Sequence, residues 1–586
     1  MIMNHALSPL VRQLRDIVGR RHVLTATSAK RDYLTGYRYG QGEALAVVRP
    51  GSLPELWKVA EACTRAGAII IMQAANTGLT GGSTPDGAYD RDVVVIATMR
   101  LRRIHVLDEA RQVVCLPGAT LDALARKLAP YGREPHSEIG SSCLGASVTG
   151  GVCNNSGGAL VRRGPAYTEA ALYARVKATG ELELVNGLGI DLGNAPEEML
   201  DRLERGAFHA DGPVPQGVAC SARDYVSQVA RVDAPTPARY NANPDYLHSA
   251  SGSAGRLIVF ALRLDTFPEV PDVHIVHVAT DSAEDLTKLR RQMLAHEACV
   301  PVSAEYLSRE MFQLAERYGK DTFLAVKLLG TQRLPLLFGL KRWVDGLAGR
   351  FGAGGAAVSD RLLQGAAGLM PAHLPRDTRD TGRRYAHHLL LKLEAGQVGF
   401  VEDMLAAGFA DREISVRKYA PGEGGGLFLH RFAAAGAAIR YATLNRDRLG
   451  ELVALDVALP RNAAVWTVLV PEALKDQVAG EFLYGHFFCH VFHLDLVLKH
   501  GADAGAFKQA ILQAFEARGA ECPAEHNVGH LYAAKPALRD FYRELDPTNS
   551  LNPGIGRTSR AQDWEPAEEG DQRKSDQDTV LDISRG

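Results

Sequence analysis

The sequence predicts an α+β protein with more than one domain, and three features support this prediction. The chain has 586 residues, which suggests two to four domains with substantial cores. Between about 44 and 118, strand-like and helix-like stretches alternate without a simple doubly wound repeat. Two stretches at 73–83 and 140–158 are rich in glycine and small hydroxyl residues. This mixture indicates an α+β fold built around glycine-rich loops.

The expected elements follow from local composition in chain order. Short runs of β-branched and other apolar residues between turn signals indicate buried strands. Amphipathic runs after a capping residue indicate helices, and Ser52 is the expected N-cap of the first of these. The predicted strands cover 44–50, 69–73, 93–99 and 112–118, and the predicted helices cover 52–67 and 120–132.

Composition excludes several classes of protein. The formal net charge of −2 argues against a nucleic-acid binder, which is normally basic. The eight cysteines form no C-x-x-C pair, so neither a disulfide framework nor a zinc knuckle is expected, and free thiols indicate a reducing compartment. The N-terminal residues lack a signal-peptide pattern, and no window is long and apolar enough to span a bilayer. We therefore expect a cytoplasmic protein, which leaves attachment to a membrane surface open.

The two glycine-rich stretches are the first candidates for a binding site. Glycine and small side chains let backbone N–H groups approach a pyrophosphate closely. Neither stretch contains G-x-G-x-x-G, and the chain has no G-x-x-x-x-G-K-[ST], which disfavours the common NAD and ATP folds. Taken alone, these stretches indicate either phosphate binding or turn-rich loops.

Longer motifs carry a resemblance to a known family. MQAANTGLTGGSTP (72–85), GREPHSEIGSSCLGASVTGG (132–151), PAEHNVGHLY (523–532) and DPTNSLNPGIG (546–556) occur in consistent order along nearly the whole chain. They resemble the p-cresol methylhydroxylase/vanillyl-alcohol oxidase family, and within it most closely the bacterial quinone-dependent D-lactate dehydrogenases. The resemblance implies a two-subdomain FAD-binding domain, an α+β cap domain that holds the substrate, and a basic membrane-binding segment.

The resemblance also implies the domain boundaries and the cofactor contacts. FAD is expected to bind noncovalently. The expected parts are an FAD-binding domain at 1–267, a cap domain at 268–326 and 385–518, a basic segment at 327–384, a return to the FAD domain at 519–558 and a disordered tail at 559–586. The expected FAD contacts are Ala74, Ala75, Asn76, Thr77, Gly78, Gly82, Ser83, Gly140, Ser147, Gly157 and Val259.

Oxidation of a 2-hydroxy acid requires a base for the hydroxyl proton and a cation for the carboxylate. The resemblance places His526, in Glu-His-Asn-Val-Gly-His, over the flavin as the base. Imidazole suits this role because its pKa lies near neutrality. Arg431 and Arg440 are both candidates for the carboxylate, and the sequence does not decide between them.

A divalent metal is a further possibility. His486 and His493 are seven residues apart, as in relatives whose histidines bind a metal together with the glutamate that corresponds to Glu525. The intervening residues are more apolar here than in those relatives. Two imidazoles and a carboxylate could hold a cation that polarises the substrate. A hydrogen-bonded pocket without metal is the alternative.

The segment 327–384 is strongly basic, with ten Lys and Arg against four Asp, hence a net charge of +6. Each basic residue near an anionic membrane contributes about 1 kcal/mol of attraction. This positive charge therefore predicts that the segment contacts anionic lipids, and a solvated basic loop is the alternative. The resemblance implies a peripheral protein on the cytoplasmic face of the bacterial inner membrane.

Together these expectations predict an enzyme that oxidises D-lactate to pyruvate and passes the electrons to ubiquinone. The nearest alternative is the same chemistry on another D-2-hydroxy acid, such as glycolate or D-2-hydroxyglutarate. A noncatalytic, membrane-associated FAD or metabolite sensor is the alternative from a different class.

Overall fold

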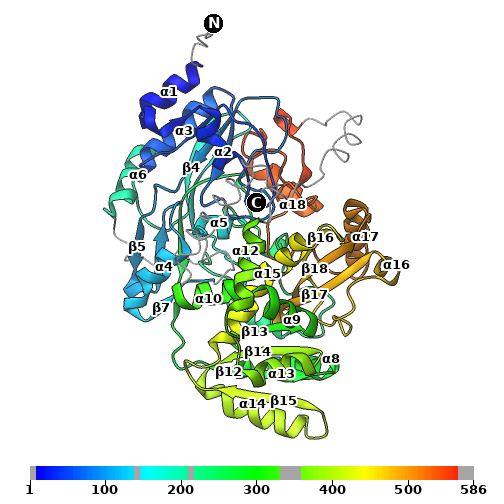
Figure 1. The fold of residues 1–586 in the computed structure, drawn as a ribbon. Helices are drawn as coiled ribbons and strands as arrows, with labels where there is room; N and C mark the ends of the chain where they lie inside the picture. Colours follow the sequence, from blue (N-terminus) through cyan, green and yellow to red (C-terminus); the bar gives the residue numbers. More distant parts are fainter. Residues whose placement is uncertain (1–7, 138–144, 209–216, 330–357, 565–586) are drawn as a thin grey trace.

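The computed structural model describes residues 8–137, 145–208, 217–329 and 358–564. The N-terminal part of the chain and the C-terminal part lie together at one end of the molecule, and the middle of the chain forms the other end (Figure 1). Three sheets carry most of the described strands, two in the first 265 residues and one between 274 and 499.

The first sheet has four strands and is largely parallel. Its order is β1 (Val23–Leu24), β2 (Ala46–Val48), β4 (Val93–Ala97), β3 (Ile69–Gln73). Helix α3 (Leu53–Arg65) connects two of these strands, and the hydroxyl of Ser52 accepts a hydrogen bond from the Glu55 N–H at 3.2 Å. The predicted N-cap is therefore confirmed. The glycine-rich loop at 74–84 begins where β3 ends.

The second sheet has five strands and is antiparallel. Two helices that flank it, α4 (Leu121–Leu128) and α5 (Val148–Cys153), begin at threonine or serine caps. The second glycine-rich stretch runs through α5, apart from residues 138–144, which are outside the described part of the chain. The strand order is β5 (Ile104–Leu107), β6 (Gln112–Cys115), β10 (Ile258–Asp265), β8 (Ala171–Val176), β9 (Leu182–Asn186).

The third sheet has seven antiparallel strands with a layer of helices on each face. Helices α8 (Ala283–Leu294), α14 (Ala395–Gly408) and α17 (Ala504–Ala517) pack on one face, and α9 (Arg309–Tyr318) and α15 (Gly425–Leu444) pack on the other. The strand order is β15 (Ile414–Tyr419), β12 (His274–Thr280), β14 (His387–Leu393), β13 (Ser303–Ser308), β17 (Val478–His486), β18 (Val491–Lys499), β16 (Leu449–Ala458).

The C-terminal segment returns to the first sheet. After α18 (Pro536–Leu545), the N–H of Ile70 in β3 donates to the Ser550 carbonyl, and the N–H of Asn552 donates to the Ile70 carbonyl. Residues 559–564 also pack on the fold, and the Trp564 indole donates to the Asp546 carbonyl at 2.7 Å. The disordered tail predicted from 559 is therefore wrong for these six residues, because a buried tryptophan anchors them.

The basic segment is described only in part, because residues 330–357 lie outside the described residues. Its described portion comprises the end of α10 (Lys320–Leu329), α12 (Val358–Leu369) and α13 (Arg376–Arg384), which pack beside α9 and α15. Among the helices that the structure describes, none combines the length and the apolar character needed to cross a bilayer.

Candidate active site

Strand register gathers polar side chains on one face of the seven-stranded sheet. Glu305 on β13 lies opposite His486 on β17, and Tyr484 lies opposite His493 on β18. His493 in turn lies opposite Asp456 on β16. Directly opposed residues point to the same face of a sheet. Four adjacent strands therefore direct two histidines and two acids toward the face that α9 and α15 cover.

The loop after α17 adds the Glu-His pair predicted from the sequence. Residues Ala458 and Glu521 form an antiparallel bridge, so this loop runs along the edge strand β16. The N–H of Glu525 donates to the Asp456 carboxylate at 2.7 Å, and the next residue, His526, contacts the same carboxylate. One aspartate thus positions both members of the predicted Glu-His pair.

His526 and Asp456 form a hydrogen-bonded dyad. The imidazole Nδ1 lies 2.8 Å from the Asp456 Oδ2, and the histidine side chain is 30% exposed whereas the aspartate is buried. Burial works against the imidazolium, but the Asp456 carboxylate outweighs burial and raises the pKa of His526. Because Nδ1 bonds the aspartate, Nε2 of the neutral ring is the nitrogen left to accept a proton.

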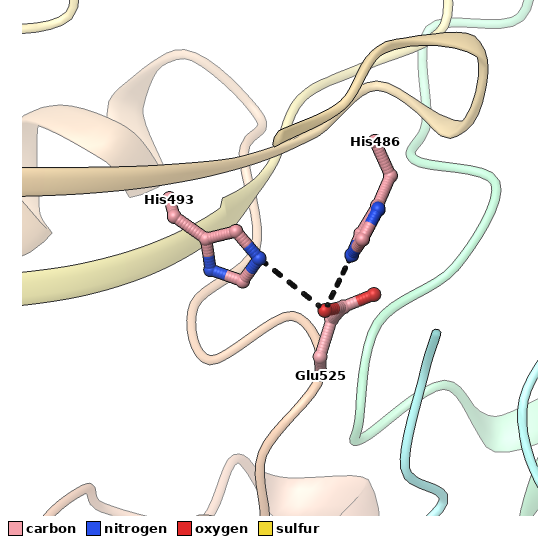
Figure 2. Close-up of side chains that lie close together, drawn as sticks. All are labelled: His486, His493 and Glu525. Carbon is pink, nitrogen blue, oxygen red and sulfur yellow. Dashed lines mark hydrogen bonds and ion pairs between the residues drawn. The ribbon is translucent and has the colours of Figure 1, made fainter. Parts of the chain in front are cut away.

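His486, His493 and Glu525, the residues that the family resemblance offers as metal ligands, lie together beside this dyad (Figure 2). The Glu525 Oε2 lies 3.1 Å from the His486 Nε2 and 3.6 Å from the His493 Nε2. The His486 Nδ1 lies 2.6 Å from Glu305. Burial opposes the charge of His486, yet the two carboxylates raise its pKa to about 10. Burial lowers the pKa of His493 to about 3.

This arrangement fits a divalent cation as well as a proton. The possible ligand atoms of the three residues lie within 4.8 Å of one another. Glu305 behind His486 is the carboxylate–histidine support that metal ligands commonly have. Without a metal, the protonated His486 ring can hydrogen-bond to Glu305 through Nδ1 and to Glu525 through Nε2. The buried Arg239 pairs with Glu525 in either case.

The two candidate arginines occupy different surroundings. Arg431 lies over the Tyr484 ring at 4.5 Å, and its Nε forms an ion pair with the Glu305 Oε2 at 2.9 Å. Arg440 lies nine residues, hence about 13 Å, further along α15. It pairs there with Asp321 and Asp360. The structure therefore brings Arg431 to the histidines and does not bring Arg440 there.

Arg38 is a further cation near the site that the sequence analysis missed. It is exposed and has no ion pair among the described residues. Burial raises the pKa of Asp495 to about 6, and Arg38 is the strongest charge that opposes this shift. Arg38 also opposes the increase in the pKa of His526 that Asp456 causes. The sequence motif around Arg38 gives it no role, because the arginine reaches the site only through the packing of loop 36–40 on loop 80–84.

Two of the expected FAD contacts, Gly82 and Gly157, lie next to these residues. A methyl group added to Gly157 would lie 2.6 Å from the Glu525 Oε1, so this glycine lies against the acidic cluster. The Ser147 hydroxyl caps α5, and Val259 is buried in β10. Gly140 lies outside the described residues. The contacts expected after β3 all belong to the loop after that strand: Ala74, Ala75, Asn76, Thr77, Gly78, Gly82 and Ser83.

Two observations support the fit of this region to FAD. Among the described residues, the backbone N–H groups of Asn76, Thr77 and Gly78 have no acceptor, as a loop that binds a pyrophosphate requires. Both ring nitrogens of His136 and the Thr149 hydroxyl are buried without a partner. Buried polar atoms normally have hydrogen-bond partners, and a polar ligand would supply them here.

Comparisons with known proteins agree with the geometry. Residues 44–184 match the family model described as "FAD binding domain", and residues 275–564 match the one described as "D-lactate dehydrogenase, membrane binding". Among solved structures, p-cresol methylhydroxylase aligns with a TM-score of 0.56 at 13% identity over 93% of this chain and 96% of its own. Alkyldihydroxyacetonephosphate synthase aligns with a TM-score of 0.54 at 12% identity over 93% of this chain and 84% of its own. These likenesses confirm the predicted α+β fold with its FAD-binding domain.

Full-length relatives are much more similar in sequence. The quinone-dependent D-lactate dehydrogenase of Escherichia coli is 49% identical over 95% of this chain and 98% of its own length. That of Haemophilus influenzae is 47% identical over 95% of this chain and 100% of its own. An Arabidopsis thaliana D-2-hydroxyglutarate dehydrogenase is 28% identical over 29% of this chain and 30% of its own. This chain belongs to the family of quinone-dependent D-lactate dehydrogenases.

Proposed function

We propose that this protein oxidises D-lactate to pyruvate at the junction of its glycine-rich loops and its histidine-bearing sheet, with His526 as the base. Family membership establishes an FAD-dependent D-lactate dehydrogenase that uses a quinone. The observation that carries the residue assignment is the His526–Asp456 dyad at 2.8 Å beside loops 80–84 and 154–158. The D-lactate hydroxyl hydrogen-bonds to the His526 Nε2.

The protein's own groups move the proton and fix the substrate. The substrate carboxylate binds between Arg431, which lies beside the histidines, and Arg38, which is exposed and has no ion pair among the described residues. The His526 Nε2 takes the hydroxyl proton, and Asp456 stabilises the imidazolium that results. FAD held by the glycine-rich loops would supply the hydride acceptor for the α-carbon. Gly157 keeps this space free, because a larger residue would meet Glu525.

A divalent cation, where present, would be held by His486, His493 and Glu525. It would supply a Lewis acid next to the substrate hydroxyl. It would replace the proton that otherwise lies between His486 and Glu525, so cation binding would release that proton.

The membrane contact and the acceptor follow from the same family. The membrane-binding family model and the absence of a spanning helix in the described residues fit peripheral attachment. Attachment at the cytoplasmic face, through the basic segment and anionic lipids, would bring the flavin near ubiquinone in the bilayer.

The decisive experiment is an anaerobic absorbance spectrum of the purified holoenzyme before and after D-lactate, with L-lactate as control. We expect the flavin bands to bleach with D-lactate alone and to return when a ubiquinone analogue is added. Bleaching by D-2-hydroxyglutarate or glycolate, but not by D-lactate, would overturn the substrate assignment. Bleaching without recovery by quinone would overturn the acceptor.

A further inference from the structure

A cavity of about 530 Å³ opens between α9, α10 and α13, separate from the residues of the active site. Four cationic side chains line it, together with one acid, Glu316. Glu316 lies 2.9 Å from Arg383 and 3.8 Å from Arg379, so one carboxylate is shared by two guanidinium groups. The cavity thus keeps a net positive charge. Its cations are Arg317, Lys320, Arg379 and Arg383.

Two buried polar atoms at this cavity lack partners in the described chain. The Nδ1 of His373 is one of them, and the side chain that carries it is only 9% exposed. The Nε of Arg379 is the other. A buried polar atom without a partner is costly and is rare in folded proteins. Both atoms therefore indicate a ligand rather than an incidental surface depression.

Hydrogen bonding to the neighbouring histidine determines what the His373 nitrogen can bind. The His430 Nε2 lies 3.1 Å from the Phe312 carbonyl, which can only accept, so that nitrogen carries the hydrogen. Burial lowers the pKa of His430 to about 3, so its Nδ1 is a bare acceptor. This Nδ1 lies 3.1 Å from the His373 Nε2, which must therefore donate.

The remaining nitrogen, the His373 Nδ1, is then also a bare acceptor. Burial, aided by Lys320 and Arg379, lowers the pKa of His373 to about 4, so the ring stays neutral near pH 7. A ligand that satisfies this cavity must combine negative charge for the arginines with a hydroxyl hydrogen for His373. Sulfate and carboxylates have the charge but no such hydrogen at neutral pH.

We propose that the cavity binds a phosphate group that carries or adjoins a hydroxyl, as in inorganic hydrogen phosphate or a phosphoglycerol unit. The arginines and Lys320 pair with the phosphate oxygens, and the His373 Nδ1 accepts from the hydroxyl. The ligand could come from solution or from a lipid headgroup, because both sources share this chemistry. The site rests on the proposed membrane contact for its lipid source, because His373, Arg379 and Arg383 belong to the basic segment, and it does not depend on the flavin chemistry.

The test measures phosphate and sulfate binding to the full-length holoenzyme by calorimetry, without D-lactate or acceptor. We expect phosphate to bind more tightly than sulfate. Replacement of the acceptor in His373→Phe should abolish that preference. Removal of one charge-assisted hydrogen bond in Arg383→Gln should weaken phosphate binding about 10-fold or more. Arg376→Gln is the matched control, because Arg376 lies on the same helix, is 89% exposed and does not line the cavity.

Glu316→Gln provides a test that misfolding cannot imitate. The change removes the carboxylate that competes for Arg379 and Arg383, so phosphate should bind more tightly than to the parent protein. Equal losses in Arg383→Gln and Arg376→Gln would overturn the proposal, because they indicate diffuse attraction. Sulfate binding as tight as phosphate would overturn it as well.

Vesicles then separate the two sources of the ligand. Binding to phosphatidylglycerol vesicles that glycerol 3-phosphate displaces, with phosphatidylcholine vesicles as control, would support a lipid headgroup. Binding of glycerol 3-phosphate that leaves vesicle binding unchanged would support a soluble phosphate ester. Failure of both glycerol 3-phosphate and phosphate to bind would overturn the site.

Discussion

At the residue scale, Asp456 controls both the orientation and the proton affinity of His526. The aspartate accepts from the Glu525 N–H and contacts the His526 Nδ1, so its two interactions hold the loop and the ring together. It is buried on β16, where its charge is not screened by water. The same arrangement, a buried aspartate bonded to the histidine Nδ1, holds the imidazole of catalytic triads in one tautomer. Asp456 is thus a positioning residue for the proposed base.

His526→Gln should keep FAD and lose turnover. Loss of a general base typically lowers kcat by about 10² to 10⁴-fold, and Gln cannot accept a proton at neutral pH. Asp456→Asn should lower kcat by a smaller factor because the imidazole remains. Stopped-flow reduction of the flavin by D-lactate measures the step directly, and the flavin spectrum checks cofactor content. Near-normal reduction in His526→Gln would exclude this histidine as the base.

Arg38→Met should raise the KM for D-lactate about 10- to 100-fold, because a charge-assisted hydrogen bond contributes about 1.5–3 kcal/mol. Arg440→Met is the comparison, since Arg440 already pairs with Asp321 and Asp360. Its loss should leave KM unchanged and lower the melting temperature, because Asp321 and Asp360 each lose an ion pair in a largely buried setting. Steady-state kinetics with a soluble acceptor distinguishes these effects. A KM that rises in Arg440→Met but not in Arg38→Met would reverse the assignment.

At the scale of elements, the sheet and α15 bury four histidines in two hydrogen-bonded pairs. The His277 Nε2 lies 3.2 Å from the His388 Nδ1, joining β12 to β14. His373 and His430 form the second pair. The Phe312 ring from α9 lies between the pairs, 4.9 Å from His388 and 4.5 Å from His430. Neutral histidines thus act as packing elements between the sheet and its helices.

These pairs should make the fold acid-labile. Burial lowers the pKa of His277 to about 4 and that of His430 to about 3, against about 6.5 in an unfolded chain. Below pH 6.5 the unfolded chain binds protons that the folded chain does not, so stability falls as pH falls toward 4. Each of these groups contributes up to about 1.4 kcal/mol per pH unit. The stability they provide is fully present above pH 6.5.

The measurement is the melting temperature between pH 7.5 and pH 4.5. His277→Gln should show a shallower decline than the parent, because one group that resists protonation is gone. His500→Gln is the control, since His500 is exposed on the loop after β18. A decline equally steep in all three proteins would show that other groups dominate the acid sensitivity.

At the scale of the whole molecule, the site is assembled from distant parts of the chain. Arg38 and Gly157 come from the N-terminal part of the chain, Glu305 and His486 from the seven-stranded sheet, and His526 from the returning C-terminal segment. The Asn527 side-chain amide donates a hydrogen bond to the Asn154 Oδ1, and the backbone N–H of His530 donates to the Thr80 carbonyl at 3.0 Å. The glycine-rich loops and the histidine-bearing sheet are therefore held together by the same short C-terminal loop.

Membrane attachment should be electrostatic and reversible. Peripheral binding through basic residues is screened within about 10 Å at 0.1 M salt and about 3 Å at 1 M. Raising the salt concentration should therefore release the protein from anionic vesicles and slow D-lactate oxidation with a lipid-soluble quinone. Oxidation with a water-soluble acceptor should change little over the same range. Attachment that resists 1 M salt would instead indicate inserted apolar contacts.

Local composition was sufficient to predict much of the molecule. The Ser52 cap, the glycine-rich loops and the mixed α+β class depend on side chains close in sequence, so they can be recognised without the fold. The long motifs around 72–85 and 523–532 were enough to predict the family and its cofactor. Residues 559–564 were assigned to a disordered tail, because one tryptophan among polar residues does not reveal that its indole is buried.

Tertiary structure alone decided which side chains act together. Asp456 and Glu305 lie in apolar strands without a motif, and only strand register places them opposite His493 and His486. Arg431 and Arg440 look equivalent in the sequence, but they lie about 13 Å apart along one helix and meet different carboxylates. Contacts between residues hundreds of positions apart depend on how strands pair and helices pack, which no short stretch of sequence encodes.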